Sequence, residues 1–259
     1  MLVLNLPVDQ IILFFFILVR VATMLFVIPF FESRNVPVLV KVGLAVSVAW
    51  LLLPQVQARP PALSASPVAF ALGLVSEIAI GLIIGLMLQL IFVGVQLAGQ
   101  TAGFQMGFAI ANVVDPASSM QIPILSQFLN LFTLMVFVTL NIHHYFIKAL
   151  VDGFAVIPFW GARFDTNLFQ LITATTAKSF IIAVRIGAPV MVALLLTSVA
   201  LGLIARTVPQ MQIFIVAMPV KILLGLLFLG ISLPFCLNYL RTLFVELGNS
   251  LQGVLHMLM

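Results

Sequence analysis

The chain has 259 residues, of which 63% are hydrophobic and only 7% are charged, and its formal net charge is +4. A soluble domain carries about 25% charged residues and needs a polar exterior, so this composition excludes a soluble enzyme and a disordered chain. The 11 basic residues are scattered singly, which leaves no basic patch for nucleic acid. The single cysteine, Cys236, excludes an intramolecular disulfide and a cysteine-based metal cluster. What remains is an integral membrane protein.

Apolar segments of helical length follow one another along the chain, and a spanning helix needs about 20 mostly apolar residues. We interpret all of them as helices, because an open strand in lipid leaves its backbone groups unpaired and the alternating pattern of barrel strands is absent. The predicted fold class is an all-α membrane protein with about six apolar helical segments, several of them broken or hairpin-like. These segments cover residues 10–31, 38–56, 68–98, 124–150, 172–205 and 214–240.

The connections are polar or rich in proline. Residues 32–37 form a short turn, and residues 57–67 contain three prolines and two serines, which is typical of a loop. Residues 151–170 are predicted to form an interfacial loop, with Trp160 at the headgroup level, and residues 206–212 make the last turn. The basic residues of the connections divide three against four between the two sides, so charge bias predicts no orientation. The tail after residue 240 has the pattern of an amphipathic helix that lies on the membrane or on a partner.

One uncharged run is too long for a single span. Residues 78–114 carry no charge, and these 37 residues would extend roughly 55 Å as a helix, nearly twice the thickness of the hydrocarbon core. Glycines occur in its second half at positions 94, 99, 103 and 107. We therefore expect the helix to end or bend there.

Charged residues inside the apolar segments are costly and are read first as functional or partnered. Lys178 and Arg185 lie seven residues apart, which places them on one helix face. The basic members of the set outnumber Glu77, its one acidic member, so the chain cannot neutralise itself and partner subunits or an aqueous cavity are indicated. We interpret these charges as ion pairs or hydrogen bonds that include contacts with other subunits; they are Arg20, Glu77, Lys178, Arg185, Arg206 and Lys221.

The most unusual stretch is GQTAGFQMGFAIANVVDPASSMQIP, residues 99–123. It is too apolar for an exposed loop and too broken for a regular helix, and buried non-helical backbone occurs in membrane proteins only within protein or around a cavity. The segment is therefore predicted to line or block a passage that flexible methionine side chains could seal. The alternatives are ordinary helix packing for Met106 and Phe108, and a simple turn or cap for Asp115-Pro116.

The sequence resembles the FliR family, the R-type component of the flagellar protein export gate, which is related to the T component of type III secretion. The stretches that carry the resemblance are RVATMLFVIPFFESRNVPVLVKVGLA, QLAGQTAGFQMGFAIANVVDP and PQMQIFIVAMPVKILLGLLFL. Together they extend over most of the chain in the order and length typical of the family.

The resemblance implies a protomer of a helical export gate in the bacterial inner membrane, at the flagellar basal body. It implies two small gate partners of P-type and Q-type, larger export-apparatus membrane proteins, and unfolded flagellar proteins as substrates. Residues 1–259 would form one domain, with 1–205 similar to the larger gate partner and 206–259 to the smaller. A plug loop is implied over residues 104–123, and its candidate sealing residues are Phe104, Met106, Gly107, Phe108, Ile110, Val113, Val114, Asp115 and Pro116.

Other functions were weighed against this one. A small-solute secondary transporter would need inverted repeats and a polar site at the midplane, and an equivalent subunit of a virulence secretion system is a further alternative. An intramembrane enzyme would need a catalytic constellation, and no catalytic residue, cofactor or metal is predicted. His143-His144 lack a metal-binding pattern and are interpreted as polar residues near an interface.

Overall fold

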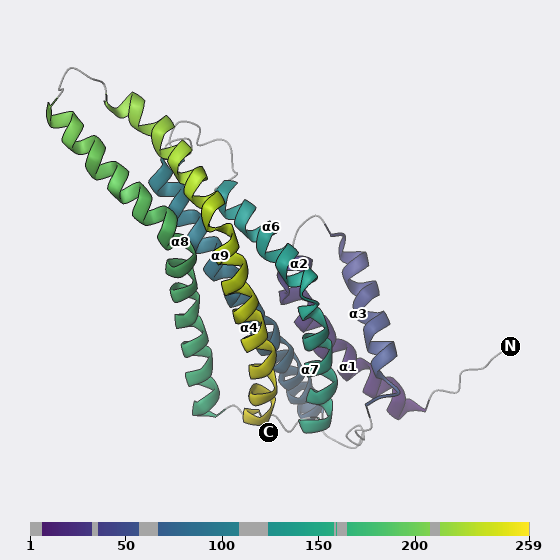
Figure 1. Ribbon diagram of the computed structural model, residues 1–259. Coiled ribbons are helices and arrows are strands. Elements are labelled where there is room, and N and C mark those ends of the chain that lie inside the picture. The colour runs from purple at the N-terminus through teal and green to yellow at the C-terminus, as the bar shows by residue number, and fades with distance from the viewer. Residues whose placement is uncertain are drawn as a thin grey trace. The chain divides into compact units, whose positions relative to one another are not determined.

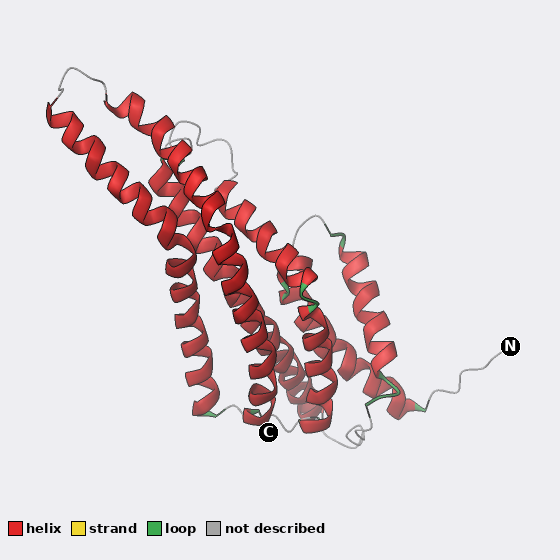
Figure 2. Cartoon of the chain, viewed as in Figure 1, coloured by secondary structure: helices red, strands yellow, loops and turns green. Residues whose placement is uncertain are grey.

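The computed structural model describes residues 7–32, 36–56, 67–108, 124–157, 159, 165–207 and 213–258. These residues form helices and connecting loops without a strand among them (Figure 2). Within these described ranges, four helices are long and apolar enough to cross a membrane, namely Val8–Val27, Phe70–Met106, Thr166–Thr207 and Val216–Leu255. The prediction of an all-α membrane protein is confirmed.

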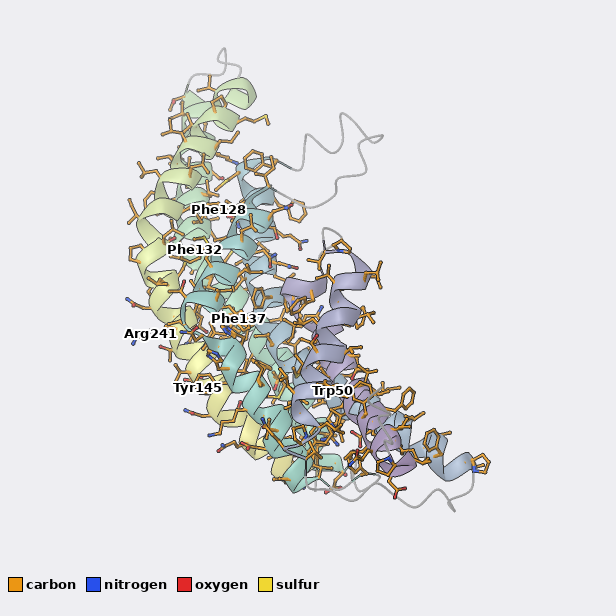
Figure 3. The ribbon with its side chains drawn as sticks, turned by 90° about the vertical axis from the view of Figure 1, so that its right-hand side faces the viewer. Trp50, Phe128, Phe132, Phe137, Tyr145 and Arg241 are labelled. Carbon is orange, nitrogen blue, oxygen red and sulfur yellow. The ribbon has the colours of Figure 1, made fainter. Side chains whose placement is uncertain are left out.

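The N-terminal helices begin where proline sets the backbone. Helices α1 (Val8–Val27) and α3 (Val38–Leu52) follow Pro7 and Pro37, whose ψ angles of 141° keep them outside the helix, and the short α2 covers Pro29–Glu32. Helix α3 packs against α1. Trp50 of α3, labelled in Figure 3, meets Phe14 of α1 edge-on with a centroid separation of 6.0 Å.

Helix α4 (Pro67–Met106) is 40 residues long and ends beyond the predicted boundary at residue 98. The expected end of the helix lies at Gly107, the last of the four glycines, because the helix runs through Gly94, Gly99 and Gly103. A side chain at Gly94 would place its Cβ 2.7 Å from the carbonyl oxygen of Ser179, and one at Gly99 would place it 2.4 Å from the Cα of Ser126. These glycines let neighbouring helices approach closely, and only Gly107 ends the helix.

The predicted segment 124–150 is two helices. Helices α6 (Ile124–Thr139) and α7 (Ile142–Val156) meet at a bend of 65°. Asn141 lies at the bend with φ of 53°, a left-handed conformation for which asparagine is enriched. The interfacial loop predicted to begin at residue 151 begins later, because α7 continues to Val156 and buries Phe154.

The last two helices are long. Helix α8 (Thr166–Thr207) begins six residues before the predicted start, where the carboxylate of Asp165 accepts hydrogen bonds from the Thr166 N–H at 2.6 Å and the Asn167 side chain at 3.1 Å. Helix α9 (Ile213–Met257) joins the predicted segment 214–240 and the amphipathic tail into one helix. The apolar face of that tail is buried within the chain, with Leu251 and Leu255 each 1% exposed.

The chain divides into two compact units. The first holds residues 1–90, 141–175 and 244–259, and the second holds residues 91–140 and 176–243. Helices α4, α8 and α9 each contribute to both units. Within the second unit, α8 and α9 run antiparallel beside each other, in green and yellow (Figure 1).

Candidate functional site

A buried ion pair lies in the first unit. The Nε–H of Arg20 on α1 donates a hydrogen bond to the Oε2 of Glu77 on α4, and both side chains are 0% exposed. The guanidinium carbon also lies 4.0 Å from the ring centroid of Phe154 on α7. A basic and an acidic group 57 residues apart therefore neutralise each other inside the chain.

Two glycines on α4 make this pairing possible. A Cβ at Gly81 would lie 2.0 Å from Thr23 Oγ1 and 2.7 Å from the carbonyl oxygen of Arg20. A Cβ at Gly85 would lie 2.8 Å from the Cβ of Val27. Gly81 and Gly85 are four residues apart, a spacing typical of close helix contacts, and here they let α1 approach α4.

Part of this polar cluster has no hydrogen-bond partner among the described residues. The atoms concerned are Nη1 and Nη2 of Arg20, Oε1 of Glu77 and the hydroxyl of Ser76. Gly153 of α7 leaves space beside the guanidinium, since a Cβ there would lie 3.5 Å from Nη1. The two opposite charges compensate each other, and their contacts hold α1, α4 and α7 together. The expectation placed Arg20 and Glu77 among the charges at subunit contacts, whereas in the structure they pair with each other inside the chain.

The other four interior charges lie toward the surface of the chain. Lys178, Arg185 and Arg206 are exposed and Lys221 is half-buried. The guanidinium of Arg185 lies 5.5 Å from the ring centroid of Tyr239 on α9. No carboxylate of the described residues pairs with any of the four within salt-bridge distance. Their charges are available to groups outside this chain.

The second unit contains the end of α4, from which the predicted plug departs. The N–H of Phe108 bonds to the carbonyl of Gly103 at 3.1 Å, and the N–H of Gly107 bonds to the carbonyl of Phe104 at 3.1 Å. Gly107 has φ of +96°. These two bonds around a left-handed glycine form a Schellman motif, so the helix stops here because Gly107 is present.

The predicted sealing residues fall into three environments. Phe104 is 54% exposed, Met106 is 0% exposed, and Gly107 and Phe108 are half-buried. Met106 lies against Gly225 of α9. The remaining candidates lie outside the described residues; they are Ile110, Val113, Val114, Asp115 and Pro116. The structure brings Met106 into the interior of its unit, which agrees with the alternative of ordinary helix packing for this residue.

Metal-binding clusters are not found in the described part of the chain, where no three His, Cys, Asp or Glu side chains converge. The rings of His143 and His144 lie 4.4 Å apart at the start of α7. The neighbouring Tyr145 (Figure 3) packs on Gly248 of α9, where a Cβ would lie 2.9 Å from its Cδ1. This end of α7 is therefore held to α9 by aromatic packing.

Comparison with known proteins gives consistent matches over most of the chain. The family described as bacterial export proteins, family 1, matches residues 11–247. The flagellar biosynthetic protein FliR of Escherichia coli is 33% identical over 245 residues, which cover 94% of this chain and 92% of that protein. The flagellar biosynthetic protein FliR of Bacillus subtilis is 32% identical over 237 residues, which cover 89% and 90% of the two chains. The matched region includes the ion pair, the end of α4 and most of α9.

Proposed function

The chain belongs to the bacterial export proteins of family 1, and we propose that it is a structural and gating subunit of the channel through which flagellar proteins leave the cytoplasm. It is a component of the flagellar export apparatus, located in the inner membrane at the basal body. Its substrates are unfolded flagellar proteins. Family membership supports the export role, and the dimensions of the apolar helices support the role of a subunit within a larger assembly.

The observation that carries the subunit role is the exposed apolar surface of α8. Large apolar side chains are exposed along this helix from Phe169, at 68%, to Ile204, at 43%. These positions are 35 residues apart, or about 53 Å of helix. A helix tilted by as much as 40° crosses about 30 Å of hydrocarbon in about 39 Å. Part of this apolar surface therefore needs cover from protein, because lipid reaches only the rest.

The cover consists of helices from two small gate proteins of P-type and Q-type, with larger export-apparatus membrane proteins nearby. Lys178 and Arg185 are exposed on one side of α8 and have no carboxylate partner among the described residues. A partner helix that supplies an acidic side chain would neutralise them, because an unpaired cation in an apolar contact is costly.

Purification from native membranes tests the subunit role. A tagged chain should co-purify with other small membrane proteins in a fixed ratio. Lys178→Glu should reduce that ratio, because the acidic partner would then face a like charge. Thr173→Glu places the same charge on another face of α8 and serves as the matched control. A chain that purifies alone would contradict the subunit role.

Residues 104–123 act as the plug of the closed channel. The support is local: α4 ends in a glycine cap at the start of this segment, and the segment beyond it is apolar without a helical pattern. Deletion of residues 109–116 keeps the cap and removes the centre of the segment. We expect the deletion to make cells that assemble the apparatus permeable to small ions, measured as a fall in membrane potential. An assembled complex with unchanged membrane potential would contradict the plug.

A further inference from the structure

Gly225 of α9 packs closely against the side chain of Met106. A Cβ at this position would lie 2.3 Å from Cε, 2.9 Å from Cγ and 3.0 Å from Sδ of Met106. The whole outer part of the Met106 side chain therefore rests on the backbone of α9. Met106 is 0% exposed, so the contact is enclosed as well as close.

Glycine is sterically required at only some positions of this helix. At Gly230 and Gly253, which are also on α9, a Cβ would meet nothing within 4 Å. Gly230 lies five residues beyond Gly225 in the same unit. Gly225 therefore lacks a side chain at the position where Met106 packs, whereas Gly230 and Gly253 face open space.

A second and looser contact runs in the opposite direction. Met218 of α9 lies two turns before Gly225 and on the same side of the helix. Its Cε and Cγ lie 3.7 and 3.9 Å from the Cβ position of Gly107. Met218 of α9 thus lies in van der Waals contact with Gly107, the residue that follows α4. We call Met106, Gly107, Met218 and Gly225 the methionine–glycine clasp.

The clasp lies directly at the base of the plug segment. Met106 is the last residue of α4, and Gly107 is the left-handed residue of the cap that follows it. The cap sets the direction in which the chain leaves α4, and the clasp fixes the end of α4 on α9. The contact contains no ion pair or hydrogen bond between side chains of its four members, and methionine is unbranched and adaptable. Such a contact separates without breaking a polar interaction.

We propose that the methionine–glycine clasp positions the plug segment in the closed channel, and that Met106 is a positioning residue which acts through this clasp. The inference rests on the proposed function, because it takes residues 104–123 as the plug. It assigns Met106 a different role from that of the sealing residues. The seal belongs to the residues beyond the cap, and Met106 determines where they start.

Alanine substitution at two glycines of α9 tests the clasp in the full chain within its native membrane complex. Gly225→Ala should displace Met106 and give a severalfold larger ion leak than wild type, at a normal level of co-purified partners. Gly230→Ala is the matched control and should leave the leak unchanged, since its Cβ meets open space. Met106→Ala should also leak. Gly225→Ala should add little to the leak in the Met106→Ala background, because the clash partner is already gone.

A crosslink tests the contact independently of the leak. In a Cys236→Ser background, the pair Met106→Cys and Gly225→Cys should form a disulfide under mild oxidation, and the pair Met106→Cys and Gly230→Cys should not. A disulfide at the first pair should also lower export in the oxidised state and release it on reduction. Failure of the first pair to crosslink would overturn the clasp even if the alanine variants fail to assemble.

The deletion of residues 109–116 distinguishes a failure of the clasp from a failure of the plug. If the deletion leaks and Gly225→Ala leaks no more than Gly230→Ala, the plug stands and the clasp is wrong. If the assembled deletion does not leak, the plug itself is wrong. Additive leaks of Gly225→Ala and Met106→Ala in the double variant would also overturn the clasp, because two residues in one contact give non-additive effects.

Discussion

At the scale of single residues, Arg20 and Glu77 are the buried charged residues of the part of the chain that the structure describes, and they pair with each other. Breaking a buried ion pair by removing one partner leaves an uncompensated charge, and this typically costs about 3–5 kcal/mol. Replacing both partners with apolar side chains of similar size is often neutral. The two residues are thus required together and tolerate joint replacement better than either single change.

Glu77→Gln should therefore destabilise the chain by about 3–5 kcal/mol. Glutamine keeps the shape of the side chain but leaves the Arg20 charge buried without a counter-charge. The measurement is the apparent melting temperature of the purified protein in detergent, followed by size-exclusion fluorescence. Glu246→Gln changes an exposed glutamate of α9 and should alter stability by no more than about 0.5 kcal/mol.

The joint replacement Arg20→Met with Glu77→Leu discriminates a charge effect from a packing effect. It should recover most of the stability that Glu77→Gln loses, because no charge then remains in the core. A double variant as unstable as the single one would show that the pair acts through shape. It would also show that the orphaned guanidinium is not the source of the loss.

At the scale of the elements, close helix packing depends on glycines that a sequence presents only as possible breaks. Gly94 and Gly99 lie inside α4 and contact α8 and α6 closely, whereas Gly81 and Gly85 contact α1. A glycine that ends a helix is distinguished by its positive φ, which among the described glycines is found at Gly107. Composition alone does not separate these uses.

Gly81→Ala should weaken the packing of α1 on α4. Its Cβ would overlap Thr23 Oγ1 at 2.0 Å and the carbonyl oxygen of Arg20 at 2.7 Å, and overpacking of this kind costs about 1–3 kcal/mol. The apparent melting temperature should fall accordingly. Gly43→Ala on α3 is the control, because its Cβ meets nothing within 4 Å and alanine favours a helix by about 0.5–1 kcal/mol. Equal melting temperatures for both variants would contradict close packing at Gly81.

The helices were largely predictable from apolar length, but their ends and bends were not. The apolar run 124–150 predicts one helix, because the polar residues at Asn141 and His143 are too few to interrupt it. The left-handed conformation of Asn141 breaks the run through backbone geometry, which hydropathy does not describe. The start of α8 at Thr166 is also marked by a local interaction, because the Asp165 carboxylate accepts a hydrogen bond from the Thr166 N–H.

The candidate site was predictable in part for a different physical reason. Burial of Arg20 and Glu77 followed from their place in apolar segments, but their pairing spans 57 residues and is set by tertiary contact. The local sequence likewise indicated Met106 and Gly107 as candidate residues, while Gly225, which contacts Met106, lies on a helix more than a hundred residues away. Sequence patterns gave the residues that need a partner, and the packing of α1, α4 and α9 determined which partner each one meets.

At the scale of the whole molecule, burial is unevenly distributed among the long helices. Of the most apolar window of each helix, 67% is buried in α4, against 17% in α8 and 22% in α9. The most apolar part of α4 is thus covered largely by its own chain, whereas the corresponding parts of α8 and α9 face mostly outward. This difference leaves the apolar surface of α8 and α9 to be covered by groups outside the chain.

Photoreactive side chains at the two ends of α8 test how that surface is covered. Phe169 is 68% exposed and Leu203 is 63% exposed, and these positions are 34 residues apart, or about 51 Å of helix. Because about 30 Å of hydrocarbon does not contain both positions, we expect a photoreactive residue at one or both of them to crosslink to another protein in native membranes. Leu194, which is 1% exposed, is the control and should crosslink only within the chain. Lipid adducts alone at both Phe169 and Leu203 would mean that the bilayer covers α8 throughout, and the subunit role would lose its structural support.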